Sequence, residues 1–204
     1  MTDLAADGAA SPPSRTKTDL RRAALARRDA LAPDVHADAA ARLADVLGGL
    51  DLPAGAIVSG FWPIRSEIDP RPALARLLAL GHALALPVVL ADATTMIFRR
   101  WTPGDTLAPA PFGLAQPLPE AAAVDPDVLL VPLAAFDRRG HRIGYGGGFY
   151  DRALERLEAT GRRFKIGLAF TVQEVARIPA EPHDRRLDLI LTEAGPITPA
   201  GDPS

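Results

Sequence analysis

The segment VLLVPLAAFDRRGHRIGYGGGFYDRALERL, residues 128–157, begins with branched apolar residues, continues through a glycine-rich stretch and ends in a helical pattern. A strand, a glycine turn and a helix start in this order present free backbone N–H groups and the positive end of a helix dipole to one anion. Glycine lets a ligand approach the backbone closely, and it adopts positive φ angles without the steric cost of a Cβ. The segment therefore predicts a phosphate site between Arg142 and Asp151.

Arginines in and around this turn support the same interpretation. Arg138, Arg139, Arg142 and Arg152 can each make bidentate contacts to phosphate oxygens. The consecutive glycines are also compatible with a flexible turn that binds nothing, and their spacing matches neither a P-loop nor a dinucleotide fingerprint. The bulky aromatic pair at 149–150 is untypical of a flexible linker, which favours a binding turn.

On both sides of this segment, short apolar runs alternate with helical patterns. This alternation predicts an α/β fold, a three-layer α/β/α arrangement with a largely parallel open sheet, Rossmann-like in type. The expected strands lie near 56–62, 83–89, 128–133, 165–170 and 187–192, and the helices between them near 72–80 and 150–160. A further strand over 96–101 is expected to be antiparallel. Five prolines between 103 and 119 predict an irregular surface excursion.

A length of 204 residues predicts one domain, which we place at 16–195. Residues 1–15 are small, polar and interrupted by prolines, so we expect a flexible lead, and we expect a flexible tail over 196–204. The domain begins with two helices, near 16–31 and 35–47, that should pack outside the sheet. Thr16 and Asp19 form the expected cap of the first.

The composition limits the classes of partner. A net charge of −2 offers no electrostatic footprint for nucleic acid or for an anionic membrane, so small molecules are the expected ligands. The absence of cysteine excludes disulfides, thiolate metal sites and a thiol nucleophile. No apolar run reaches the roughly 18 residues of a membrane helix, and the N-terminus lacks the pattern of a signal peptide. We expect a cytoplasmic monomer.

Two more loops carry functional groups at the ends of predicted strands, where open α/β sheets bind ligands. In SGFWPIRSEIDP, residues 59–70, Trp62 could stack on a flat heterocycle while Glu67 accepts hydrogen bonds from it, although Trp62 is equally compatible with the core. In the loop before the last strand, Asp184 could join Asp151 in holding Mg²⁺. His183 beside it is a possible general base.

The chain resembles the 5-formyltetrahydrofolate cyclo-ligase family, also called 5,10-methenyltetrahydrofolate synthetases, from about Lys17 to Thr192. The most specific part is PLAAFDRRGHRIGYGGGFYDRAL at 132–154, and IPAEPHDRRLDLILTE, KTDLR and SGFWPIRSEID occur in the expected order. The resemblance implies a three-layer α/β fold and the conversion of 5-formyltetrahydrofolate to 5,10-methenyltetrahydrofolate with ATP and Mg²⁺.

The resemblance also implies roles for individual residues. Arg142 and Tyr150 are the expected catalytic groups, and Asp151 and Asp184 the expected magnesium ligands. The residues expected to bind ATP are Lys17, Arg21, Arg142, Gly144, Tyr145, Gly146, Gly147, Gly148, Phe149 and Tyr150, and those expected to bind folate are Trp62, Glu67 and residues 145–150. Gly147 stands where some members carry a lysine, so a phosphate contact is either missing or supplied by Arg152 or Arg139.

Two other classes of function use similar features. A sugar-phosphate isomerase or acyl transferase on a similar sheet would need a placed base or a glutamate nucleophile, but no ATP. A non-catalytic folate-binding protein would keep Trp62 and Glu67 while tolerating loss of the arginine and metal sites. The presence of Arg142, Asp151 and Asp184 together favours the ATP-dependent enzyme.

Overall fold

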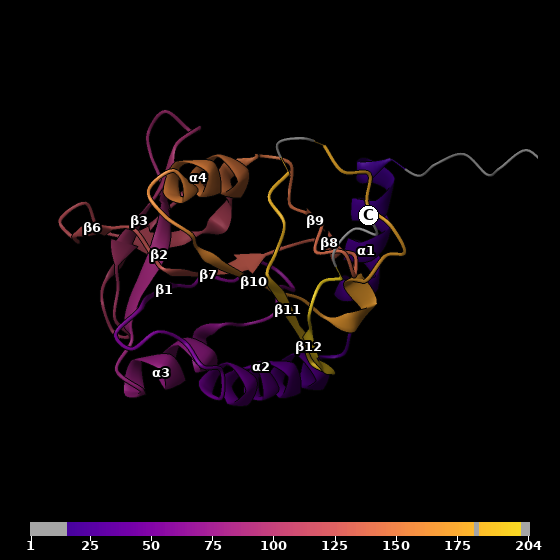
Figure 1. Cartoon of the computed structure of the whole chain (residues 1–204), viewed down its shortest axis with the longest axis horizontal. Coiled ribbons are helices and arrows are strands. Elements are labelled where there is room, and N and C mark those ends of the chain that lie inside the picture. Colours follow the sequence, from indigo (N-terminus) through magenta and orange to yellow (C-terminus); the bar gives the residue numbers. More distant parts are fainter. Residues whose placement is uncertain (1–15, 182–183, 201–204) are drawn as a thin grey trace, which may run out of the picture.

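A mixed eight-stranded sheet forms the centre of the computed structural model, which describes residues 16–181 and 184–200 (Figure 1). The strand order is β12–β11–β10–β7–β1–β2–β3–β6. The five inner strands from β11 to β2 are parallel, and β12, β3 and β6 join antiparallel at the edges. The largely parallel sheet and the antiparallel strand near 96–101 are both confirmed. The strands are β1 (Ile57–Ser59), β2 (Ala83–Val89), β3 (Met96–Arg100), β6 (Ala123–Val124), β7 (Val128–Pro132), β10 (Phe164–Leu168), β11 (Leu189–Thr192) and β12 (Gly195–Ile197).

Helices cover both faces of this sheet, as the alternating pattern predicts. In Figure 1, α2 (Pro33–Gly48) and α3 (Arg71–Ala79) lie on one side of the sheet and α4 (Phe149–Glu158) lies on the other. Successive side chains of a strand point to opposite faces. In β7, Val128 and Leu130 therefore enter the core with α2 and α3, whereas Leu129 and Val131 enter the core with α4.

The first helix, α1 (Lys17–Asp29), lies at the end of the sheet beside a small hairpin (Figure 1). Its start is capped by Thr16, whose hydroxyl oxygen accepts a hydrogen bond from the N–H of Asp19 at 3.2 Å. Leu20 and Ala24 bury its apolar side in a separate small core, against the hairpin and a short 3₁₀ turn, η2 (Thr171–Gln173). This packing directs the polar side of α1 toward the glycine turn.

Two hairpins were not predicted from the sequence. One, formed by β8 (Ala135–Phe136) and β9 (Arg142–Ile143), is inserted between β7 and the glycine turn. The other, formed by β4 (Leu107–Pro109) and β5 (Ala115–Pro117) around the 3₁₀ turn η1 (Pro111–Gly113), lies in the stretch predicted to be irregular. In a two-stranded sheet both strands are edges, which is where proline is tolerated.

The predicted C-terminal boundary needs correction. Residues 196 and 197 belong to β12, which pairs with β11, so the domain continues past residue 195. The expected flexible lead over 1–15 and the last four residues of the expected tail lie outside the described residues. Within the described ranges, none of the helices has the length and apolar character needed to cross a membrane.

Candidate active site

The glycine turn, residues 144–148, connects β9 to α4 and provides a row of backbone donors. Gly146 and Gly148 have positive φ angles of 99° and 64°, and Gly148 is the N-cap of α4. Within the described part of the chain, the main-chain N–H groups of residues 145–148 donate to no backbone carbonyl. Together with the first N–H groups of α4, they form a row of backbone donors of the kind that binds anions at helix N-termini.

Arg142, in β9 just before this turn, is held by the first turn of α4. Its two terminal nitrogens donate to Asp151 Oδ1 at 3.0 and 2.9 Å, and one also donates to the Arg185 carbonyl at 3.3 Å. Burial lowers the pKa of the Arg142 guanidinium, and the Asp151 carboxylate opposes that effect. Because arginine stays protonated in proteins, the site keeps a buried positive charge.

Lys17 and Arg21, four residues apart on α1, reach the same region from the other side. Arg21 Nε donates to the Gly144 carbonyl at 2.7 Å, and Lys17 Nζ lies 2.7 Å from Asp184 Oδ2 and 3.3 Å from Glu181 Oε1. Burial lowers the pKa of Lys17, but the attraction of Asp184 and Glu181 outweighs it, so the net pKa is raised. The structure thus brings Arg21 to the turn, whereas Lys17 contacts the loop before β11.

Asp151 and Asp184 are each paired with a cation, with Arg142 and Lys17 respectively. Both carboxylates act electrostatically on Arg142, so they border one region of the site. Among the described residues, no three His, Cys, Asp or Glu side chains form a metal cluster. The pair fits Mg²⁺ that takes its remaining ligands from phosphates and water, the usual case for this ion. His183 lies outside the described residues.

A cavity of about 500 Å³ opens beside the turn, at the carboxyl ends of β1, β2 and β7. Its size lies within the roughly 300–1,000 Å³ typical of small-molecule sites. It is lined by predicted residues from the loop after β1, from β9, from the glycine turn and from α4: Trp62, Glu67, Arg142, Gly144, Tyr145, Gly147, Gly148, Phe149, Tyr150 and Asp151. Lys17, Arg21, Gly146 and Asp184 do not line it. The residues predicted to bind phosphate and those predicted to bind folate therefore meet along the turn, but they do not all face one cavity.

Two acid–base groups in this cavity are unusually buried. Burial raises the pKa of the Glu67 carboxyl above its usual value, although hydrogen bonds from Tyr145 and from the Ile64 N–H and the charge of Arg28 oppose the shift. Burial also raises the pKa of the Tyr150 hydroxyl, and this hydroxyl has no hydrogen-bond partner among the described residues. A buried polar group without a partner is the kind of group that a ligand atom or water satisfies.

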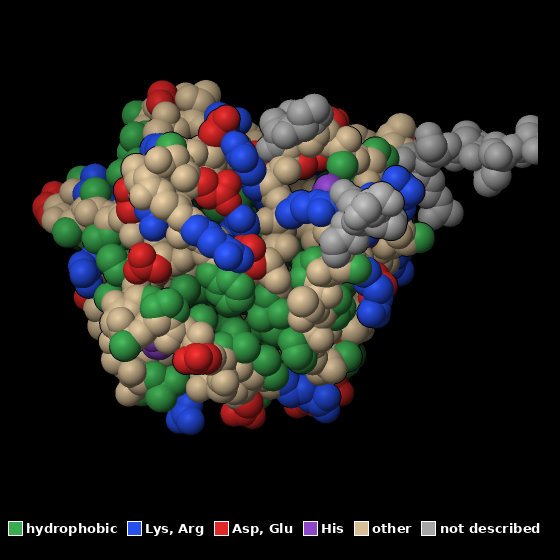
Figure 2. Space-filling model, in the orientation of Figure 1, with side chains coloured by type: hydrophobic (Ala, Val, Ile, Leu, Met, Phe, Trp, Pro, Cys, Tyr) green, Lys and Arg blue, Asp and Glu red, His purple; other side chains and the backbone are tan. Residues whose placement is uncertain are grey.

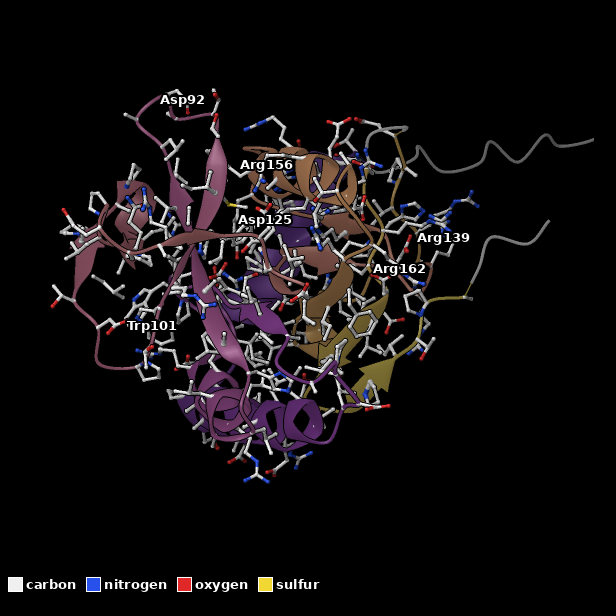
Figure 3. The ribbon with its side chains drawn as sticks, turned by 60° about the vertical axis from the view of Figure 1, so that its left-hand side comes forward. Asp92, Trp101, Asp125, Arg139, Arg156 and Arg162 are labelled. Atoms are coloured by element: carbon white, nitrogen blue, oxygen red, sulfur yellow. The ribbon has the colours of Figure 1, made fainter. Side chains whose placement is uncertain are left out.

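Trp62 lines the cavity and is held by two ring contacts. The Trp101 ring, just after β3 (Figure 3), stands edge-to-face to it at 6.3 Å, and the Arg71 guanidinium lies 5.1 Å from its ring centroid. The partly buried indole is thus both a packing residue and a cavity wall, which joins the two interpretations that the sequence leaves open.

Arg152 is the arginine that contacts the turn at Gly147. It donates to the Gly147 carbonyl at 2.9 Å and to the Thr94 carbonyl at 3.1 and 2.9 Å, in the β2–β3 turn whose Asp92 is labelled in Figure 3. Arg139 instead donates to Asp137 and to the Ile178 carbonyl. Of the two arginines considered as substitutes for a lysine at Gly147, Arg152 is therefore the one at the turn.

Sequence reasoning assigned no role to three residues of this region. Arg28 is buried and donates hydrogen bonds to the hydroxyl groups of Tyr145 and Ser66. Gln116, which lines the cavity from β5, lies in the proline-rich stretch and accepts a hydrogen bond from the Val89 N–H at 3.2 Å. One feature of the sequence could have identified Arg28, because it lies on the helix face that carries Lys17 and Arg21. No feature of the sequence identifies Gln116 as a site residue.

The fold and the site together define an α/β protein with an enzyme-like small-molecule cavity at the carboxyl ends of its parallel strands. On the face shown in Figure 2, basic side chains lie among acidic ones. A model of the 5-formyltetrahydrofolate cyclo-ligase family matches residues 13–193. The chain therefore belongs to the 5-formyltetrahydrofolate cyclo-ligase family.

Individual relatives agree with this assignment. The 5-formyltetrahydrofolate cyclo-ligase of Mycolicibacterium smegmatis is 37% identical over 186 residues, which cover 87% of this chain and 94% of the relative. That of Escherichia coli is 32% identical over 66% of this chain and 76% of its own length. The 5,10-methenyltetrahydrofolate synthetase structure from Aquifex aeolicus superimposes with a TM-score of 0.73 at 26% identity, over 92% of this chain and 95% of that one. The synthetase from Mycoplasma pneumoniae gives 0.69 at 25% identity, over 90% and 99%.

Proposed function

We propose that this protein converts 5-formyltetrahydrofolate and ATP into 5,10-methenyltetrahydrofolate, ADP and phosphate in a Mg²⁺-dependent reaction. The observation that carries the proposal is the meeting of two kinds of surface at one turn. The backbone N–H groups of the glycine turn and the buried Arg142 border the same aromatic cavity as the buried Glu67. We expect the protein to act on these small molecules as a cytoplasmic monomer.

The chemistry explains why both surfaces are needed. The formyl carbon of an amide is a poor electrophile because its oxygen is a poor leaving group. Transfer of the γ-phosphoryl group to that oxygen makes it a phosphate ester, and ADP leaves. N10 of the folate then attacks the formyl carbon, phosphate leaves with its bond electrons, and N10 gives up its proton as the ring closes. Such a transfer needs positioning and charge neutralisation more than a protein nucleophile.

The chain's own residues fit these tasks. The N–H groups of residues 145–148 and the Arg142 guanidinium would stabilise the transferring phosphoryl group. Asp151 and Asp184 would hold Mg²⁺, which neutralises phosphate charge when bound. Lys17 and Arg21 would bind the phosphates from α1, while Trp62, Tyr145 and Phe149 would enclose the flat folate rings. Tyr150, whose buried hydroxyl has no hydrogen-bond partner among the described residues, would bond to the substrate near the reacting atoms.

A spectroscopic assay tests the proposal. Purified protein with 5-formyltetrahydrofolate, ATP and Mg²⁺ should form a product that absorbs in the near ultraviolet, where the substrate does not, and one ADP per product molecule. Equal product formation without ATP would favour a transferase or isomerase. Folate binding without turnover under any nucleotide would favour a binding protein.

A further inference from the structure

Arg28 is a buried charge that does not line the cavity. It lies in the last turn of α1 with only 2% of its side chain exposed. Its Nε donates to Ser66 Oγ at 3.0 Å, and one terminal nitrogen donates to the Tyr145 hydroxyl at 2.6 Å. Burying a guanidinium is costly unless hydrogen bonds and an opposite charge compensate for the lost hydration. Arg28 must therefore have partners that compensate for its lost hydration.

The carboxylate nearest in sequence supplies little of that compensation. Asp29 Oδ1 lies 3.8 Å from the guanidinium, and its side chain is 57% exposed, so solvent screens the pair. Glu67, in contrast, is buried and interacts electrostatically with Arg28. The buried cation is thus compensated by hydrogen bonds to Ser66 and Tyr145 and by the charge of Glu67, and of these residues Tyr145 and Glu67 line the cavity.

Tyr145 joins the two charges through its hydroxyl. Arginine can only donate, so the hydroxyl oxygen accepts from Arg28 and its proton is available for the hydrogen bond to Glu67. Glu67 also accepts a hydrogen bond from the Ile64 N–H, which donates to Oε2 at 2.9 Å. The Tyr145 residue is nevertheless 40% exposed and lines the cavity. Its polar end is anchored while much of its ring remains open to a ligand.

We propose that Arg28 is a positioning residue that fixes the Tyr145 ring as a wall for a flat substrate and fixes the Glu67 carboxylate as its hydrogen-bond acceptor. The inference rests on the proposed folate site. It assigns to Arg28 a role in recognising the folate rather than ATP, although Lys17 and Arg21 on the same helix serve the phosphate side. The groups that face Glu67 are Arg28 from α1, Tyr145 from the turn and Tyr150 from α4.

The test compares Arg28→Met and Arg28→Lys with the control Arg22→Met, which removes an exposed arginine from the same helix. Arg28→Met should raise the KM for 5-formyltetrahydrofolate by about tenfold or more, the scale of a lost hydrogen bond to a charged group, while the KM for ATP stays within about twofold. Arg22→Met should match wild type. Arg28→Lys keeps the charge but not the fork that reaches Ser66 and Tyr145 together, so it should restore only part of the folate affinity.

A pH profile supplies a readout that a purely structural role would not change. Arg28 favours the ionised form of Glu67, so in Arg28→Met the acid limb of kcat/KM should move to higher pH, and in Arg28→Lys it should stay near wild type. Tyr145→Phe keeps the ring but removes the hydroxyl that connects Arg28 to Glu67, so it should raise the folate KM. In the double variant with Arg28→Met, it should cause no additional increase.

Tyr145→Phe changes a partly exposed residue and carries the test even if Arg28→Met fails to fold. Unchanged folate KM in Tyr145→Phe, equal increases in both KM values, or an unmoved acid limb in folded Arg28→Met would overturn the proposal. Absence of ring closure by wild-type protein would instead refute the proposed function, so the two failures are distinguishable.

Discussion

Arg142 and Asp151 are joined by two hydrogen bonds, of 3.0 and 2.9 Å, from both terminal guanidinium nitrogens to one carboxylate oxygen. This pair fixes the buried cation across the base of the glycine turn, since Arg142 precedes the turn and Asp151 follows it. Both bonds go to Oδ1, and the Asp151 side chain remains 28% exposed. The proposed phosphate site and the proposed metal site therefore share one ion pair.

Removal of this cation should abolish most activity. We expect Arg142→Ala to lower kcat/KM by about 10²–10³-fold, the typical cost of losing a preorganised charge-stabilising group. Arg156→Ala, which breaks the exposed pair with Asp125 labelled in Figure 3, is the matched control and should retain wild-type turnover. Circular dichroism and thermal unfolding check that both variants fold. A folded Arg142→Ala with near wild-type turnover would remove Arg142 from the site.

The magnesium requirement should depend on Asp184. Asp184→Asn replaces a charged oxygen ligand with a neutral one, so the Mg²⁺ concentration giving half-maximal rate should rise. Because Asp184 also bonds to Lys17, Lys17→Met is measured in parallel; it should raise the KM for ATP without the same shift in the Mg²⁺ titration. Identical Mg²⁺ titrations for Asp184→Asn and wild type would assign the residue to a structural role.

Glu67 should make the stability of the fold depend on pH. Its pKa is raised in the folded protein mainly by burial, so the folded state binds the proton more tightly than the unfolded state does. Stability from this group is then complete at low pH and is lost as pH rises through the unfolded and then the folded pKa. Glu67→Gln removes this titration, so its melting temperature should fall less than that of wild type between pH 4 and pH 7. An equal or larger fall in the variant would contradict the burial argument.

Gly140, in the loop between β8 and β9, should tolerate replacement poorly. Its φ is +86°, and a Cβ there would lie 2.9 Å from the Leu187 carbonyl oxygen. Gly81 has a similar φ of +93° with nothing within 4 Å, so it isolates the cost of the backbone angle alone. We expect Gly81→Ala to cost about 1–2 kcal/mol and Gly140→Ala clearly more, as measured by denaturant unfolding. Equal losses would show that the loop relaxes around the added methyl group.

The sequence predicted the main sheet and helices of the fold better than its short strands. Runs such as Val128–Pro132 and the amphipathic pattern of 149–158 carry several residues of consistent period, so the sheet and α4 were foreseeable. β8 and β9 have two residues each, and β12 has three, too few for a period. β8 pairs with β9 and β12 pairs with the preceding strand β11, so these pairings are local, but strands this short carry no pattern that identifies them in the sequence.

Part of the candidate site was likewise predictable from the sequence and part was not. The glycine turn was predictable because its residues are contiguous and their chemistry depends on backbone conformation. The link from Arg28 to Tyr145 was not, because 117 positions separate the two residues and only the packing of α1 brings them together. Arg28 in the sequence is one arginine among several in an arginine-rich helix, and its burial is a tertiary property.

The most direct test of phosphoryl activation follows the formyl oxygen itself. Wild-type protein is given 5-formyltetrahydrofolate labelled with ¹⁸O in the formyl group, together with unlabelled ATP and Mg²⁺, and the inorganic phosphate is analysed by mass spectrometry. If the formyl oxygen attacks the γ-phosphorus and later leaves as part of phosphate, each phosphate released with a ring closure should carry one ¹⁸O atom. Label found in water, with unlabelled phosphate, would contradict the account.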